Sequence, residues 1–214
     1  WSSNAGPNQN VLYGAIGINC GIYCTFLYLD QQKQQGYVTN YAKFVNNFTL
    51  NLTRFKEGYY WTALTSCFSH VNFMHLLSNM VSLYFMGGLL VNASVINPAR
   101  FITIIVGSGL AGSLGYLVNR AQKPTNRWGI DQQRALGFSG CVMGIGTVAA
   151  CMFPKTKFLI YGIVPMPLWA LMGGYFLYDG YYVSSDQSRT AHAGHLGGLV
   201  FGLGYYLLVL RSGR

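Results

Sequence analysis

The stretch Gly137-Phe138-Ser139-Gly140 begins an apolar segment that continues to residue 153. A serine between glycines at the start of such a helix places a hydroxyl where lipid would not solvate it. Two other apolar segments also begin with polar residues, one with His75 and Asn79 and one with His195. If these are alternate helices of one bundle, all three enter the membrane from the same face, and their polar side chains lie within about two turns of it. A hydroxyl, imidazoles and an amide at similar depth suggest a nucleophile, a base and oxyanion donors.

The composition indicates a membrane protein. Of 214 residues, 51% are hydrophobic and only 9% are charged, against roughly 25% charged in an ordinary soluble domain. The formal net charge of +9 comes from 14 Lys and Arg against 5 Asp and Glu. These basic residues are dispersed in the loops, which is typical of charges that flank membrane helices. With no basic patch or nucleic-acid motif, we expect a lipid bilayer and no nucleic acid as the environment of the chain.

Six apolar segments predict an all-α polytopic membrane protein with six transmembrane helices. The segments are residues 11–29, 71–91, 98–118, 137–153, 158–178 and 193–210. Residues 1–10 are expected to be a disordered polar lead-in, and residues 11–214 a single domain.

The first loop and the fifth apolar segment each have an unusual composition. Residues 30–69 mix aromatic residues with Lys and Arg, which favours an amphipathic first loop half-buried among lipid headgroups. A soluble loop folded over the bundle is the alternative. Pro165 and Pro167 predict a kink or loose packing in the fifth segment.

The five cysteines are Cys20, Cys24, Cys67, Cys141 and Cys151. Their odd number and the absence of paired-ligand spacing with histidine favour small buried hydrophobic residues over a disulfide or a metal site. We therefore expect neither a metal ion nor a cofactor.

Glycine spacing on the fourth and sixth segments predicts close helix packing. Gly140 and Gly144 are four residues apart, as are Gly194 and Gly198, and such stripes let two helix backbones approach closely. Packing of these faces would bring Ser139 and His195 into hydrogen-bond range. The alternative is ordinary membrane-helix packing with an incidental serine.

Three motifs in this order resemble those of the rhomboid intramembrane serine proteases. They are His70-x4-His75-x3-Asn79, Gly137-x-Ser139-Gly140 and Ala191-His192-x2-His195-Leu196-Gly197-Gly198. The resemblance implies a six-helix rhomboid-like bundle with Ser139 as nucleophile and His195 as general base, a dyad with no required acid. It also implies an oxyanion and substrate site made of His75, Asn79, Gly137 and the backbone N–H of Ser139.

Other polar residues receive supporting roles. His192 lies one turn from His195 and competes for the role of base, but the resemblance to His-x-x-Gly favours His195 and leaves His192 structural. His70 is expected to tie the first loop to the second segment. Met143 stands where bacterial relatives often have a tyrosine beneath the histidine ring. Asp131, Asp179 and Asp186 could orient a histidine, although nothing in the spacing requires one.

The resemblance implies a transmembrane protein substrate whose helix enters laterally past the fifth span. A catalytically inactive rhomboid-like binding or chaperone protein is the alternative. A channel or transporter is disfavoured because the predicted span centres lack ionisable residues. Secretory-pathway members of that family often add a span after the core and none fits after Arg214, so the resemblance leads us to expect the mitochondrial inner membrane. Glycosylation at Asn47, Asn51 or Asn92 would instead indicate the secretory pathway or plasma membrane. The oligomeric state is not predicted.

Overall fold

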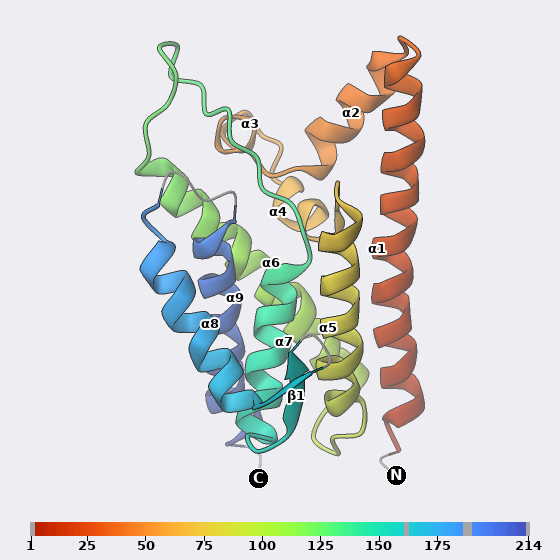
Figure 1. Cartoon of the computed structure of the whole chain (residues 1–214), viewed down its shortest axis with the longest axis vertical. Coiled ribbons are helices and arrows are strands. Elements are labelled where there is room, and N and C mark those ends of the chain that lie inside the picture. Colours follow the sequence, from red (N-terminus) through yellow and green to blue (C-terminus); the bar gives the residue numbers. More distant parts are fainter. Residues whose placement is uncertain (1–2, 161–162, 186–189, 213–214) are drawn as a thin grey trace.

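Long helices that run along one common direction form the body of the molecule (Figure 1). The computed structural model describes residues 3–160, 163–185 and 190–212. The main helices are α1 (Ala5–Gln34), α5 (Phe73–Val91), α6 (Pro98–Ala121), α7 (Ser139–Met152), α8 (Leu168–Tyr182) and α9 (His192–Tyr205). The chain alternates in direction, so α5, α7 and α9 all begin at the end opposite to the two termini. A π-helical turn, η2 (Tyr206–Leu210), extends α9.

Short elements cover the end of the bundle where α5, α7 and α9 begin. They are α2 (Val38–Phe48), α3 (Leu52–Lys56), α4 (Thr62–Thr65) and the 3-10 turn η1 (Ser66–Phe68). Asn51 joins this first loop to the connector before α7, because its buried side-chain amide donates to the carbonyls of Asp131 and Gln133 at 2.8 Å each. The same side chain accepts from the Arg54 N–H and caps α3. The first loop therefore supports the connector that leads to Ser139.

Local capping fixes where α5 and α6 begin. The Asn72 side chain accepts from the His75 N–H at 3.1 Å, and the Asn97 side chain accepts from the Arg100 N–H at 2.9 Å. Pro98 occupies the first turn of α6, where its missing N–H would have had no helical partner. The predicted second and third segments therefore match the observed helices closely.

Among the described residues, four helical stretches are long and apolar enough to cross a membrane, namely Ala5–Gln34, Phe73–Val91, Pro98–Ala121 and His192–Leu210. The helix Ser139–Met152 is apolar but shorter. The largely helical polytopic architecture is confirmed, and the number of six spans stays a prediction.

The prediction of a disordered lead-in over residues 1–10 is wrong from Ala5 onward, because α1 begins there. Asn8 is fully buried and its side-chain amide donates to the carbonyls of Val91 and Ile96, at 3.2 and 2.9 Å. These long-range hydrogen bonds order a polar segment that has no apolar pattern of its own. Residues 1 and 2 lie outside the described part of the chain.

The prediction of a helical fifth segment from residue 158 is also wrong. Strands β1 (Lys157–Ile160) and β2 (Val164–Pro167) form an antiparallel hairpin in which Phe158 pairs with Met166. Pro165 and Pro167 lie in β2, ahead of α8, so they do not kink a helix. A proline lacks the N–H that a helix interior needs, and it is tolerated on an edge strand.

Glycines bring α6, α7 and α9 into backbone contact. A Cβ atom at Gly198 would collide with the carbonyl oxygen of Gly140 and lie 2.8 Å from its carbonyl carbon. A Cβ at Gly202 would collide in the same way with the backbone of Gly144, and one at Gly112 would lie 2.7 Å from the Gly194 oxygen. No flexible side chain at these contacts can move aside, so the separation of the helices depends on the missing side chains.

Replacing Gly198 with alanine is therefore expected to destabilise the fold by about 1–3 kcal/mol, the usual range for overpacking. Gly204→Ala on the same helix is the matched control, because a Cβ there has nothing within 4 Å. Both changes replace glycine by a better helix former, so only the contact differs. Thermal unfolding in detergent measures the effect. Equal melting temperatures for the two variants would contradict the proposed role of the contact.

Candidate active site

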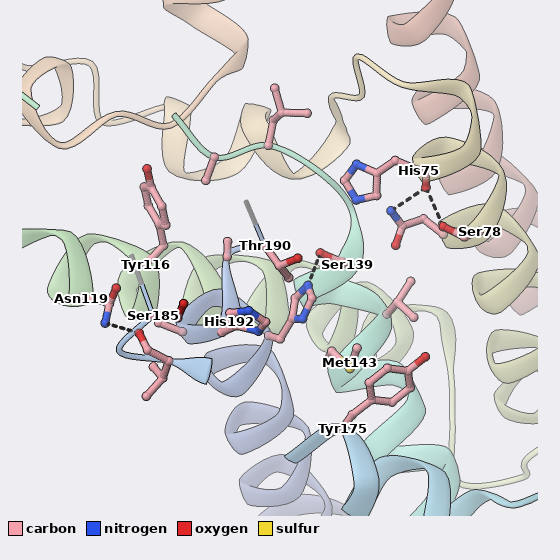
Figure 2. Close-up of a pocket in the computed structure, with 18 of the residues that line it drawn as sticks. His75, Ser78, Tyr116, Asn119, Ser139, Met143, Tyr175, Ser185, Thr190 and His192 are labelled. Atoms are coloured by element: carbon pink, nitrogen blue, oxygen red, sulfur yellow. Dashed lines mark hydrogen bonds between the residues drawn. The ribbon is translucent and has the colours of Figure 1, made fainter. Parts of the chain in front are cut away.

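Ser139 is the first residue of α7, and its hydroxyl oxygen lies 2.8 Å from Nε2 of His195 on α9. The side chain of Phe138, just before it, is fully buried and packs against Phe68 of η1 with ring centroids 5.4 Å apart. This packing anchors the turn before α7. Figure 2 shows the hydrogen bond of Ser139, with His75 and Ser78 on one side of it and Tyr116 and Asn119 on the other.

Asp179, in the last turn of α8, contacts both histidines of α9. Nδ1 of His195 lies 3.1 and 3.2 Å from its two carboxylate oxygens, and Nδ1 of His192 lies 2.6 Å from Oδ1. The Asp179 side chain is only 1% exposed. His192 and His195 are three residues apart and therefore project from the same face of α9.

The carboxylate contacts determine which nitrogen of His195 carries the proton. An ionised carboxylate only accepts hydrogen bonds, so Nδ1 of His195 donates to Asp179 and Nε2 presents its lone pair. The Ser139 hydroxyl then donates to Nε2. This is the tautomer in which a histidine can remove the proton of a serine nucleophile.

Gly137 lets the His75 ring approach the turn that carries Ser139. Its φ angle is +127°, a conformation that only glycine adopts readily. A Cβ atom at this position would lie 2.6 Å from Cε1 and 3.0 Å from Nε2 of the His75 ring. The Gly137 N–H donates to the Ser66 carbonyl at 2.9 Å, so η1 holds this turn in place.

Asn79 lies 5% exposed on α5, behind His75. Its side-chain nitrogen is 3.1 Å from Nε2 of His70 and donates to the His75 carbonyl at 3.0 Å. His70 is fully buried in the loop before α5, and its Nε2 also accepts from the Phe138 N–H at 3.3 Å. Burial, with a smaller contribution from His75, lowers the pKa of His70 to about 3. His70 is therefore neutral at physiological pH.

A cavity of about 1130 Å³ extends past Ser139 and His195. On one side it is lined by Ser82 and Met86 of α5, and on another by Leu171 and Tyr175 of α8. Met143, one turn after Ser139, is buried at the cavity wall. This volume is slightly above the roughly 300–1,000 Å³ of typical small-molecule pockets.

The structure thus places Ser139, His195, His75 and Asn79 around one cavity. Gly137 lies against the His75 ring, and His70 contacts the Asn79 side chain. The sequence indicated Asp179 only as one of three aspartates that could orient a histidine, because nothing in the spacing requires such a contact. The structure extends α8 through Tyr182 and buries Asp179 against α9. The one feature of the sequence that points to Asp179 is that an acidic residue directly follows an apolar segment. Asp131 instead pairs with Arg120, and Asp186 lies outside the described residues.

This fold belongs to a known class of membrane protein. The rhomboid domain model matches residues 57–212, and the chain belongs to the rhomboid family.

Three of the proteins that it resembles are named as mitochondrial. The chain is 28% identical to RHOMBOID-like protein 12, mitochondrial, of Arabidopsis thaliana over 201 residues, which are 89% of this chain and 56% of that protein. It is 25% identical to Rhomboid protein 1, mitochondrial, of Saccharomyces cerevisiae over 217 residues, 93% and 54% of the two chains. It is 23% identical to the human presenilin-associated rhomboid-like protein, mitochondrial, over 96% of this chain and 50% of that one. The chain spans about half the length of these relatives.

Together with its apolar helices, these similarities make the chain an integral mitochondrial membrane protein of the mitochondrial rhomboid branch. The alternative of the secretory pathway rested on three possible glycosylation sites. One of them, Asn51, is 3% exposed and uses its side-chain amide to bind the connector before α7. Its amide nitrogen is not accessible for modification in the folded protein.

Proposed function

We propose that the protein is an intramembrane serine endopeptidase that hydrolyses peptide bonds in or near transmembrane helices. The observation that carries this proposal is the 2.8 Å contact between the Ser139 hydroxyl and His195 Nε2, with Asp179 against Nδ1 of the same ring. A serine hydroxyl is a weak nucleophile at neutral pH and needs an adjacent base to attack a carbonyl. Here the base is in contact and in the required tautomer.

In the proposed reaction the Ser139 oxygen attacks the scissile carbonyl carbon while His195 Nε2 takes the hydroxyl proton. The imidazolium that forms is stabilised by the buried Asp179 carboxylate. His195 then gives this proton to the leaving amine, and the peptide C–N bond breaks to leave an acyl group on Ser139. Water, activated by the same histidine, hydrolyses that ester.

The oxyanion is proposed to be bound at the start of α7. The first N–H groups of a helix have no partner within the helix, and the helix dipole there favours negative charge. The Ser139 N–H is such a group, and the His75 ring lies next to Gly137 beside it. Asn79 lines the same cavity. Donors aimed at a developing oxyanion contribute about 10²–10³ in rate each.

The proposed substrate is a transmembrane helix of another membrane protein. The cavity lies between residues of α5 and residues of α8, so a segment that entered laterally past α8 would reach Ser139. The proposed location is the mitochondrial inner membrane. No cofactor and no metal take part in the proposed reaction.

The experiment is to incubate the protein, reconstituted in liposomes, with a fluorophosphonate probe and to locate the modified residue by mass spectrometry. We expect covalent modification of Ser139 that is lost after denaturation. A probe that modifies other residues or none would contradict the proposal. It would favour the alternative, a rhomboid-like protein that binds membrane-protein clients without turnover.

A further inference from the structure

His70 contacts the two structural elements that carry the proposed oxyanion donors. On one side its Nε2 lies 3.1 Å from the side-chain nitrogen of Asn79 on α5. On the other side the same atom accepts from the backbone N–H of Phe138 at 3.3 Å. Phe138 directly precedes Ser139, so this second bond fixes the peptide next to the nucleophile. The one lone pair of this nitrogen is therefore shared between the two donors, and it joins α5 to the turn before α7.

These contacts determine the protonation state of His70. A backbone N–H can only donate, so Nε2 must present a lone pair toward Phe138. The proton of the neutral ring then lies on Nδ1, and Asn79 must point its NH₂ group, not its oxygen, at Nε2. The Asn79 contact with the His75 carbonyl requires the same orientation, because a carbonyl only accepts. The two contacts thus agree on how the Asn79 amide is oriented, and together they use both of its hydrogens. Asn79 therefore holds the start of α5 in place, and the proposed oxyanion donors that it helps to align are the His75 ring and the Ser139 N–H.

Because the His70 ring uses Nε2 for both contacts, its other nitrogen, Nδ1, is left without a hydrogen bond. Nδ1 of His70 is fully buried and has no hydrogen-bond partner within the described residues. Buried polar groups without partners are rare in native proteins and call for an explanation. For His70 the explanation is that the contacts of Nε2 with Asn79 and Phe138 fix the position of the ring, and in that position Nδ1 reaches no partner among the described residues. The His75 ring lies edge-on to it, with ring centroids 5.0 Å apart.

We propose that His70 is a positioning residue of the proteolytic site, which sets the Asn79 amide and the Phe138–Ser139 peptide relative to each other through Nε2. The inference rests on the proposed protease function and does not give His70 contact with substrate. Oxyanion donors act on the transition state more than on the bound substrate. A residue that aligns them should therefore affect kcat and leave KM nearly unchanged.

The test compares His70→Phe, which keeps an aromatic ring but removes the acceptor, with His70→Gln, which can present an oxygen acceptor. We expect kcat for a model transmembrane substrate to fall by about 10- to 100-fold in His70→Phe, with KM within about twofold. His70→Gln should recover part of this loss. Combining His70→Phe with Asn79→Ala should lower kcat little beyond the larger single effect. Each change alone already removes the same contact between His70 and Asn79.

Ser69→Ala is the matched control. Ser69 is 1% exposed in the same loop, and its hydroxyl donates to the Thr65 carbonyl, away from the proposed site, so kcat should be unchanged. A purely structural role of His70 would lower the melting temperature and the folded fraction but not kcat per folded molecule, and it would overturn the inference. So would full additivity of the His70 and Asn79 effects. Failure of the proposed function itself would be distinguishable, because the unmodified protein would then show no cleavage.

Discussion

Ser139→Ala is expected to reduce cleavage of a reconstituted transmembrane substrate to background. Removing the nucleophile of a serine protease lowers kcat by about 10⁶-fold, and what remains comes from binding and oxyanion stabilisation alone. The change removes only the Oγ atom that contacts His195 Nε2, and alanine is a good helix former at the start of α7. The rate is measured by product formation in liposomes at several substrate concentrations.

The same variant should bind substrate as well as the unmodified protein, because a nucleophile contributes little to ground-state binding. Ser69→Ala again serves as the control for loss of a buried serine hydroxyl elsewhere in the loop region. Cleavage by Ser139→Ala at the original rate would mean that another group attacks the peptide bond.

Asp179→Asn is expected to lower kcat by about 10²–10⁴-fold, on the precedent that an asparagine in the corresponding position of a serine protease leaves the histidine in the wrong tautomer. An amide can donate to Nδ1 of His195, and the proton would then shift to Nε2, the atom that must accept from Ser139. A neutral amide also cannot stabilise the imidazolium as a carboxylate does. The expected loss corresponds to about 3–5 kcal/mol of transition-state stabilisation.

Asp131→Asn is the matched control for this prediction. Asp131 is 3% exposed and pairs with Arg120 at 2.6 Å, so its replacement should lower the melting temperature without a comparable fall in rate per folded molecule. Thermal unfolding in detergent gives the folded fraction of each variant independently of its reactivity. If Asp179→Asn kept the original rate per folded molecule, the reaction would need only Ser139 and His195, as in the dyad that the resemblance implies.

Several helices could be predicted because their boundaries are determined locally. Asn72 and Asn97 cap α5 and α6 through bonds to residues three positions later, and Pro98 suits the first position of a helix. The fifth segment was mispredicted because apolar residues around Pro165 suit a membrane helix and a β-hairpin equally well by composition. Hydrophobicity alone does not distinguish the two.

The candidate site was predictable where the residue type is unusual for its surroundings. Ser139, His75, Asn79 and His195 are polar residues near the ends of apolar segments, and their spacing resembles a known family. Asp179 was not selected because its distance in sequence from His195 says nothing about their contact. Its importance depends on where α8 ends and on how α8 packs against α9.

The sequence by itself determined the lipid environment, most of the long helices and the face at which the polar residues gather, because hydrophobicity, capping and helix direction are properties of each segment. Only the tertiary structure decided that Asp179 contacts both α9 histidines, that His70 joins Asn79 to the turn before Ser139, and that Lys157–Ile160 pairs with Val164–Pro167. Each of these depends on distances between segments far apart in the chain. Side-chain packing fixes such distances, and no local pattern encodes them.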